Sequence, residues 1–331
     1  MIVALRRRPD GRRRLAGEPL PLPAMADAVP EVRLLGATDT TYVAVTDLTK
    51  RYGSSTAVDR ATFAVGRGEA VALWGPNGAG KTTVLRCLLG IARYDGHVAV
   101  DGLSPARDGR AVRRRIGFVP QELPTPNLTV GEMACYVADL KRASHADARA
   151  RLALLGIGDQ TDKGVADLSG GMRQRLSLAL ALIGDPSILL LDEPTANLDV
   201  RGRTDLLEML RHLKREGMTI VFSSHRPEDV LMLADHILSI TGGAIEADLT
   251  PQQFLEMLQA HARLLLHVDE NRAPQAAETL GRLGFVAEGQ GSIVSVALRG
   301  EPKGRVIGAL ARAGFDVEDF EMERGAWTGQ L

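Results

Sequence analysis

A nine-residue loop, Gly75-Pro-Asn-Gly-Ala-Gly-Lys-Thr-Thr83, constrains this chain more than any other feature of its sequence. It fits the pattern G-x-x-x-x-G-K-[ST], in which a strand leads into the loop and a helix leaves it. The apolar run Ala70–Trp74 predicts that strand, and Thr82–Leu89 predicts the helix. Glycines let backbone N–H groups converge on phosphate oxygens, and the helix N-terminus adds favourable partial charge. The loop therefore predicts an α/β domain that binds nucleotide phosphates, with Lys81 on the β- and γ-phosphates.

Two adjacent carboxylates follow a second apolar run, Ile188–Leu191. Such a run is typical of an interior strand of a parallel sheet, and open α/β sheets bind ligands at the carboxyl ends of their strands. We expect Asp192 to hold Mg²⁺ through water and Glu193 to polarise the attacking water. By itself the pattern also fits a strand that runs into a solvated turn. The phosphate loop upstream favours the nucleotide interpretation.

A third motif, Leu168-Ser-Gly-Gly-Met-Arg-Gln-Arg175, lies between the first two. Ser169 can cap a helix that begins near Met172, and the glycines expose N–H groups that can bind an anion. With its two neighbouring motifs in this order, it resembles the signature motif of ABC ATPases. The resemblance covers about residues 42–245. It implies an α/β fold, a P-loop ABC ATPase cassette with a mixed sheet core and a helical subdomain at about 120–170.

The resemblance also gives roles to four single residues, each of which has a structural alternative. Tyr52 resembles the aromatic that stacks on adenine, and is otherwise a tyrosine at a strand end. Gln121 resembles the glutamine that reaches Mg²⁺ and the attacking water, and is otherwise a surface-loop residue. Asp199 resembles a carboxylate that acts across a dimer interface, and is otherwise a helix cap. His225 resembles the histidine that contacts the γ-phosphate, and is otherwise a core histidine.

The predicted site has three overlapping groups of residues, and its implied cofactors are ATP and Mg²⁺. The catalytic group is Glu193, His225, Gln121 and Lys81. The ATP-binding group is Tyr52, Gly75, Pro76, Asn77, Gly78, Ala79, Gly80, Lys81, Thr82, Thr83 and Asp199, joined in trans by Ser169, Gly170 and Gly171 of a second cassette. The Mg²⁺ ligands are Thr82, Gln121 and, through water, Asp192.

The rest of the chain divides into three further regions. Residues 1–40 predict a disordered N-terminal extension, with Met25 as an alternative start. Six arginines oppose two acids within residues 1–24, and such an arm could otherwise contact anionic lipid headgroups. After the cassette at 41–245, residues 246–262 predict a helical linker. Residues 263–324 read as strand, helix, strand, strand, helix and strand, which predicts a small ferredoxin-like α+β domain.

Composition excludes several classes of protein. The net charge of −1 rules out strong overall attraction to nucleic acid, so no nucleic-acid partner is expected. Two cysteines rule out a disulfide scaffold or a four-cysteine zinc site. No apolar run approaches the ~20 residues that a membrane span needs, so we expect no direct membrane insertion. The expected location is cytoplasmic, at the inner face of the cell membrane through a multi-span permease.

The leading prediction is the ATP-binding and ATP-hydrolysing subunit of an ABC transporter, in which ATP closes a dimer of cassettes and hydrolysis reopens it. One chain has one phosphate loop and one signature, so it needs a second cassette, most simply a second copy. The family docks its permease on the helical region after Gln121, and Leu128–Glu132 resembles the usual entry. The alternative is a non-transport ABC ATPase that acts on DNA or ribosomes. No long heptad insertion, second cassette or set of zinc cysteines supports that alternative.

The C-terminal appendage resembles that of ATPases from the multidrug and polysaccharide exporter branch, which favours export. The stretches 72–78 and 86–90 also resemble the ATPase that serves copper-site assembly of nitrous oxide reductase. With no cysteine and only His267 in residues 263–324, the appendage is a poor copper site. We expect it to act in dimerisation or regulatory packing, and otherwise in ligand sensing. Trp74 stands where a smaller aliphatic residue is usual, which the sequence does not explain.

Overall fold

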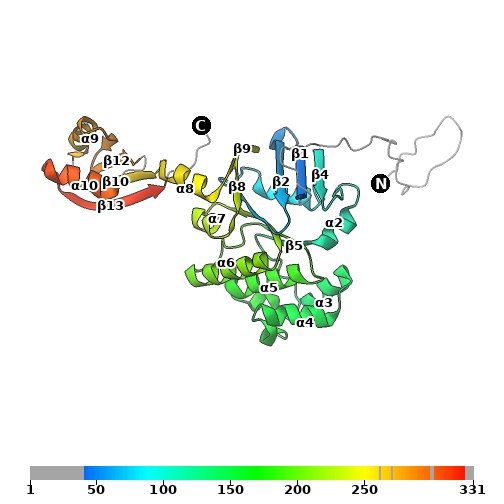
Figure 1. Cartoon of the computed structure of the whole chain (residues 1–331). Coiled ribbons are helices and arrows are strands. Elements are labelled where there is room, and N and C mark those ends of the chain that lie inside the picture. Colours follow the sequence, from blue (N-terminus) through cyan, green and yellow to red (C-terminus); the bar gives the residue numbers. More distant parts are fainter. Residues whose placement is uncertain (1–40, 261, 270, 299–301, 325–331) are drawn as a thin grey trace, which may run out of the picture. The chain divides into compact units, whose positions relative to one another are not determined.

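The computed structural model describes residues 41–260, 262–269, 271–298 and 302–324. The extension predicted at 1–40 lies outside the described residues. Among the described residues there are three sheets, of six, three and four strands. The first two sheets, with helices α1 to α8, form the part that we call the cassette (Figure 1). No helix in the described ranges is both long and apolar enough to cross a bilayer.

The six-stranded sheet has the order β5-β6-β7-β3-β8-β9 and carries the predicted site at one edge. In that order its strands span Ile116–Val119, Ile188–Leu191, Thr219–Ser224, Ala70–Trp74, His236–Thr241 and Ala244–Leu249. Neighbouring strands are parallel except β8 and β9. Every residue of β3, β6 and β7 is buried, which explains their continuous apolar or small side chains. Parallel pairing places the carboxyl ends of these three strands at the same edge.

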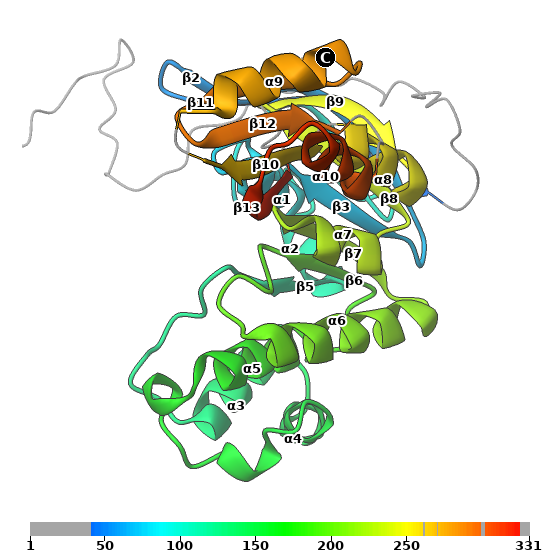
Figure 2. The same ribbon diagram turned by 90° about the vertical axis from the view of Figure 1, so that its left-hand side faces the viewer.

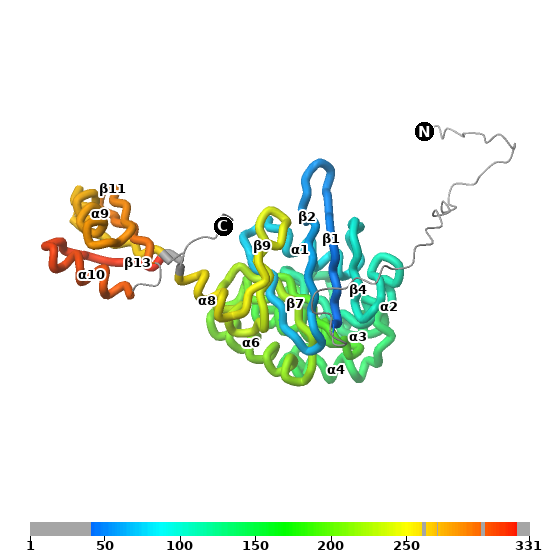
Figure 3. Tube along the Cα trace, turned by 45° about the horizontal axis from the view of Figure 1, so that its top comes forward, coloured from blue at the N-terminus to red at the C-terminus, as the bar shows by residue number. Residues whose placement is uncertain are grey.

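Strand β3 separates two hydrophobic cores because its side chains alternate between the two faces of the sheet. Ala70, Ala72 and Trp74 belong to one core, while Val71 and Leu73 belong to the other. The second core is shared with the antiparallel sheet β2-β1-β4, and Figure 3 shows the β1–β2 hairpin beside β4. The elements of that core are β1 (Thr41–Tyr52), β2 (Ser55–Gly66), β4 (Asp95–Val100), α1 (Lys81–Leu88) and α2 (Gly109–Arg115).

Helices cover the other face of the six-stranded sheet, and Figure 1 shows α3, α4 and α5 grouped together. The hydroxyl of Thr129 accepts the N–H of Glu132 at 3.2 Å, and the Glu132 carboxylate accepts the N–H of Thr129 at 2.8 Å, so a capping box starts α3. Helices α3, α4 and α5 are the helical subdomain. The sequence pattern does not predict strand β5, which has only four residues. The helices are α3 (Val130–Lys141), α4 (His145–Leu154), α5 (Gly170–Leu182), α6 (Val200–Arg215), α7 (Pro227–Leu233) and α8 (Pro251–Ala260), with short 3₁₀ turns at Gly158–Gln160 and Val165–Asp167.

Helix α8 packs against the strand that leads into the phosphate loop. Phe254 is fully buried, and its ring meets the Trp74 ring edge to face with centroids 5.0 Å apart. This contact explains why a large aromatic residue, Trp74, precedes the phosphate loop. The segment predicted as a helical linker thus contains a helix, and one face of that helix belongs to the core of the cassette. The domain boundaries stay a prediction.

The residues after α8 form a small antiparallel sheet with the order β11-β12-β10-β13 and two helices (Figure 2). Leu280 of α9 and Leu310 of α10 are buried with Leu264, Leu266 and Val294 of the sheet. The element order and the strand order confirm the ferredoxin-like plan. The elements are β10 (Ala262–Val268), α9 (Ala273–Arg282), β11 (Val286–Gln290), β12 (Ile293–Ala297), α10 (Lys303–Arg312) and β13 (Val317–Arg324).

Replacing Phe254 by alanine tests how much α8 stabilises the cassette. Truncating a fully buried phenylalanine costs about 3–5 kcal/mol of unfolding free energy. Its neighbour Leu255 is 43% exposed and offers a matched control. We expect Phe254→Ala to lower the melting temperature by roughly 10 °C, measured by calorimetry, and Leu255→Ala to lower it much less. Equal shifts would show that the buried Phe254 stabilises the cassette no more than the exposed Leu255 does.

Candidate active site

The phosphate loop passes between the backbones of two other segments, and only glycine fits at the points of contact. A Cβ on Gly75 would lie 2.1 Å from the carbonyl oxygen of Ile240, and a Cβ on Gly80 would lie 2.3 Å from that of Ala57. A Cβ on Gly78 would meet nothing within 4 Å, so this part of the loop faces open space. Because α1 begins directly after Gly80, the free N–H groups of its first turn lie at the loop, where they can bind phosphate oxygens.

Lys81 is buried at the start of α1. Its ammonium donates hydrogen bonds to the carbonyl oxygens of Gly75 at 2.7 Å and Pro76 at 3.0 Å, and it lies 3.6 Å from Glu193 Oε1. Burial lowers the pKa of Lys81, and the negative charges of Glu193 and Asp192 offset only part of that decrease. The positive charge is therefore held at the phosphate loop, close to the end of β6.

Asp192 is buried at the carboxyl end of β6, where two hydroxyl groups hold its carboxylate. Asp192 Oδ1 accepts a hydrogen bond from Thr82 Oγ1 at 2.9 Å and another from Ser223 Oγ at 2.8 Å. The N–H of Asp192 donates to the carbonyl oxygen of Val119 at 2.9 Å. These bonds join the ends of β5, β6 and β7 to the first turn of α1.

Ser223 is a site residue that the sequence analysis did not single out. It is fully buried in β7, where its hydroxyl donates to Asp192 and accepts the N–H of Glu193 at 2.8 Å. A polar residue that follows the apolar residues of β7, two positions before His225, is the signal that could have identified it. Since one hydroxyl binds both acidic residues, Ser223 fixes the end of β6 against the end of β7.

Glu193 has a left-handed backbone conformation, with φ 45°, which residues other than glycine seldom adopt. Strain of this kind is typical of functional sites. Glu193 Oε1 lies 3.6 Å from Lys81 Nζ, and Oε2 lies 3.1 Å from His225 Nδ1. The structure therefore brings three of the predicted catalytic side chains together, while their roles remain predictions.

Ser169 and Asp199 both cap helices, as expected for Ser169 and as the structural alternative for Asp199 proposed. Each accepts the backbone N–H three residues further on, at 3.3 Å and 2.8 Å respectively. Helix α5 begins at Gly170, two residues before the expected start near Met172. A Cβ on Gly170 would lie 3.2 Å from the carbonyl oxygen of Asn197, so the signature lies beside the loop that carries Asp199. Both caps are exposed, and their predicted roles towards a second cassette stay predictions.

Tyr52 and Gln121 lie at the margin of this cluster. Tyr52 is 48% exposed near the tip of the β1–β2 hairpin, which reaches the phosphate loop at Ala57. Gln121 is exposed just after β5, at the same sheet edge as Asp192. In the part of the chain that the structure describes, no hydrogen bond joins Gln121 to Asp192. The contacts expected with adenine and Mg²⁺ remain predictions.

This chain is similar in sequence to known proteins. A family model described as ABC transporter matches residues 58–196. The Nod factor export ATP-binding protein I of Burkholderia lata is 38% identical over 213 residues, which are 62% of this chain and 70% of that protein. This chain belongs to the ATP-binding proteins of ABC transporters. The linearmycin resistance ATP-binding protein LnrL of Bacillus subtilis is 33% identical over 207 residues, which are 61% of this chain and 67% of that protein.

The ABC cassette is also found among solved structures. The ATP-binding subunit of an ABC transporter aligns with a TM-score of 0.59 and 28% identity, over 63% of this chain and 90% of that one. The family and the P-loop ABC ATPase fold confirm the leading prediction of an ATP-binding and ATP-hydrolysing transporter subunit. The relatives' names refer to export and resistance, and none of them favours the alternative of an ATPase acting on DNA or ribosomes.

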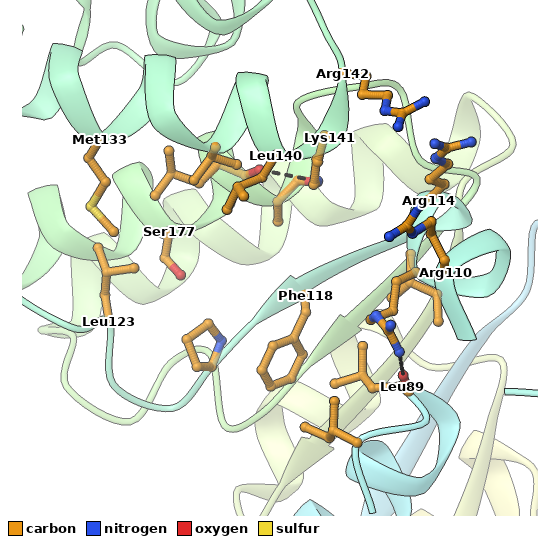
Figure 4. Close-up of a pocket in the computed structure, with 17 residues that line it drawn as sticks. Leu89, Arg110, Arg114, Phe118, Leu123, Met133, Leu140, Lys141, Arg142 and Ser177 are labelled. Atoms are coloured by element: carbon orange, nitrogen blue, oxygen red, sulfur yellow. Dashed lines mark hydrogen bonds between the residues drawn. The ribbon is translucent and has the colours of Figure 1, made fainter. Parts of the chain in front are cut away.

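A groove of about 690 Å³ lies beside the ABC ATPase site, between α2 and β5 on one side and α3 and α5 on the other. Much of its wall is apolar, including Phe118, Leu123 and Met133 (Figure 4). Two further lining residues are large apolar side chains open to solvent, since Ile91 is 61% exposed and Leu140 is 65% exposed. Exposed apolar side chains gathered around a groove are typical of an interaction surface.

Replacing Ser223 by alanine tests whether its hydroxyl positions the carboxylates of Asp192 and Glu193. The variant leaves a buried N–H and a buried carboxylate each without one partner, so we expect ATP turnover to fall by roughly 10- to 100-fold. Nucleotide binding should persist because the phosphate loop is unchanged. Ser239→Ala is the control, because Ser239 is also fully buried, in β8, but its hydroxyl has no hydrogen-bond partner within the described residues. A similar loss of turnover in both variants would assign the effect to general destabilisation.

Proposed function

We propose that this subunit binds ATP at the loop between β3 and α1 and hydrolyses it with Glu193 as the residue that polarises water. The observation that carries the proposal is the strained position of Glu193, whose carboxylate lies between Lys81 at 3.6 Å and His225 at 3.1 Å. Both side chains reach the same carboxylate beside the phosphate loop. A water bound to Glu193 would therefore face the γ-phosphate of a nucleotide held by that loop.

Hydrolysis forms a bond from the water oxygen to the γ-phosphorus and breaks the bond to the oxygen that stays on ADP. Glu193 accepts a proton of the attacking water. Lys81 offsets the negative charge of the β- and γ-phosphates, and His225 donates to a γ-phosphate oxygen. In this proposal the rate enhancement comes from positioning and charge neutralisation, since phosphoryl transfer needs little covalent help from the protein.

The oxygen atoms at the end of β6 fit Mg²⁺. This ion prefers oxygen ligands and usually combines one or two carboxylates with water and substrate phosphates. Thr82 and Asp192 offer a hydroxyl and a carboxylate oxygen 2.9 Å apart, directly after the phosphate loop. We infer that Thr82 holds the ion directly, Asp192 holds it through water, and Gln121 completes the set. The ion would neutralise phosphate charge.

A second cassette completes the proposed site, most simply as a homodimer. The signature lies at the N-terminus of α5, where Ser169 is exposed and the two glycines after it are half-buried. Such a helix terminus can bind the phosphates of a nucleotide held by another copy. Asp199 is exposed on the adjacent loop, and this placement supports its proposed role across the same interface. A role of the C-terminal domain in dimerisation or regulatory packing stays a prediction.

We also propose that the groove beside the ATPase site receives a separate multi-span permease. Pro120 lines this groove and directly precedes Gln121, so the docking surface and a proposed Mg²⁺ ligand share one loop. A chain docked in this way would work on the cytoplasmic face of the membrane. The relatives named for Nod factor export and linearmycin resistance support the direction of export. The role in copper-site assembly stays a prediction.

The change Glu193→Gln tests the proposed hydrolysis. It keeps the shape of the side chain but removes the charge that polarises water, so we expect turnover to fall by roughly 10²-fold or more. ATP binding should persist because the phosphate loop and Lys81 are unchanged. Turnover is measured by phosphate release and binding by a fluorescent ATP analogue. Glu208→Gln on α6 is the exposed control. Near-normal hydrolysis by Glu193→Gln would contradict the assignment of Glu193 as the residue that polarises water.

Mixing two inactive chains tests the proposed pairing of cassettes. Lys81→Ala disables the phosphate loop of its own chain, and Ser169→Ala disables the signature. A mixed dimer then has one site in which both partners are intact, so ATPase activity should rise above that of either variant alone. Subunit exchange is verified by two affinity tags. If exchanged dimers recover no activity, the signature does not act in trans.

A further inference from the structure

We propose that Asp229 is a positioning residue for ATP hydrolysis. Its buried carboxylate binds the loop of residues 194–198, which we call the bridging loop because it joins Glu193 to Asp199. This bond holds the bridging loop against α7, the helix that follows His225. The proposal rests on the proposed function, because it concerns how the side chains of Glu193 and His225 are held beside each other.

Asp229 is buried, although the stability of its own helix does not require burial. It lies in the first turn of α7, and its side chain is 2% exposed. A negative charge in the first turn favours a helix through the helix dipole, but an exposed side chain supplies this charge without the cost of losing water. Glu228, in the same turn, is exposed. The burial of Asp229 is therefore explained by its partners in other segments.

The two partners of Asp229 lie on either side of Asp199 in the chain. Thr195 in the bridging loop is 3% exposed, and its Oγ1 donates a hydrogen bond to Asp229 Oδ2. Arg203 on α6 forms an ion pair with the other oxygen, with Nε 2.9 Å from Oδ1. A buried carboxylate needs such partners, because it has lost its water. One side chain thus binds both the loop before Asp199 and the helix after it.

The bridging loop has few other hydrogen bonds. The N–H of Ala196 donates to the carbonyl oxygen of Glu193 at 3.1 Å. The N–H of Leu198 donates to the carbonyl oxygen of Thr195 at 3.3 Å. Both of these bonds close turns within the same stretch of chain. Among the described residues, the hydrogen bond from Thr195 to Asp229 is the one that joins the bridging loop to a distant segment.

Helix α7 is a fixed support for this bond. Val230 and Leu233 are buried in the core that covers one face of the six-stranded sheet. Helix α7 also contacts α6, beside which it lies in Figure 1. Because α7 begins at Pro227, two residues after His225, a bond to this helix places the bridging loop at a defined position relative to His225.

Three side-chain contacts join the segment that follows β6 to the segment that ends β7, and they occur in the same order along both. They are Asp192–Ser223, Glu193–His225 and Thr195–Asp229. The outer two are buried hydrogen bonds, and the middle one, at 3.1 Å, joins two of the predicted catalytic side chains. A bond on each side of the middle pair restricts its separation and its orientation together. Small errors in such positions reduce a reaction rate strongly.

A role in the fold alone is the alternative explanation for the hydroxyl of Thr195. Valine has nearly the shape of threonine but lacks the hydroxyl, whereas serine keeps the hydroxyl and lacks the methyl group. If the side chain only fills space, valine is the better replacement. If it positions the bridging loop through Asp229, serine is the better replacement. The two variants therefore separate packing from hydrogen bonding.

The experiment measures phosphate release by the full chain with Mg²⁺ and ATP. We expect Thr195→Val to lower kcat by about tenfold, because the bridging loop is no longer held against α7. Thr195→Ser should keep kcat within about threefold of the unaltered chain. The KM for ATP should change by less than about twofold in both, because the phosphate loop is unaltered. Circular dichroism verifies that each variant is folded at the assay temperature.

Thr219→Val is the matched control. Thr219 is also a buried threonine, at the opposite end of β7, where its hydroxyl accepts the N–H of Gly68 at 2.9 Å. The substitution removes the same group and leaves one partner without its hydrogen bond, so its effect on stability should be similar. Its kcat should stay within about twofold of the unaltered chain, because the site is at the other end of the strand.

A second variant tests the other oxygen of Asp229 if Thr195→Val does not fold. Arg203→Gln removes the ion pair at a side chain that is only partly buried. We expect it to lower kcat by about three- to tenfold with little change in KM. Arg211→Gln makes the same change at an exposed position of α6 and should leave kcat unchanged. Equal kcat for these two variants would contradict the proposal.

Three outcomes with the threonine variants would also overturn the proposal. The first is a loss of kcat in Thr195→Ser as large as in Thr195→Val. The second is an equal loss of kcat in Thr195→Val and Thr219→Val, and the third is a rise in KM without a fall in kcat. The proposed function fails separately. Normal hydrolysis by Glu193→Gln would contradict that function, whereas an inactive Glu193→Gln beside a fully active Thr195→Val would contradict only the role of Asp229.

Discussion

The hydroxyl of Ser223 makes two hydrogen bonds on which the geometry of the ABC ATPase site depends. It donates to Asp192 and accepts the N–H of Glu193, so the two acidic residues are bound to the neighbouring strand by the same oxygen atom. Because β6 and β7 are entirely buried, neither strand can slide to make other bonds without exposing apolar side chains. Thr82 then ties the same carboxylate to α1. A buried polar group without its partner costs about 1–3 kcal/mol, so each member of this network holds the others in place.

Much of this arrangement can be predicted from local sequence. Strands β3 and β6 follow the predicted residues because a short, continuous apolar run between polar loops has one simple explanation in an α/β protein. The start of α1 follows within one residue from the loop motif. The small C-terminal domain could be predicted because Val294 and Val296 alternate with less buried residues, as a strand with one covered face requires.

The rest could not be predicted because it depends on contacts between residues distant in the chain. Nothing near Trp74 in the sequence indicates that its ring would meet Phe254. The convergence of Phe118 and Met133 on one groove depends on how α3 is placed beside β5. The left-handed conformation of Glu193, whose N–H is bound to Ser223 of the neighbouring strand, is likewise not indicated by the sequence.

The contact between Trp74 and Phe254 has a mechanical consequence. Strand β3 ends at Trp74 and the phosphate loop begins at the next residue, while α8 ends at Ala260 and the first strand of the C-terminal domain begins at Ala262. The helix that precedes the second domain therefore packs, through Phe254, against the residue that precedes the phosphate loop. A truncation before α8 would remove an aromatic ring from beside that residue, whereas a truncation after α8 would preserve it.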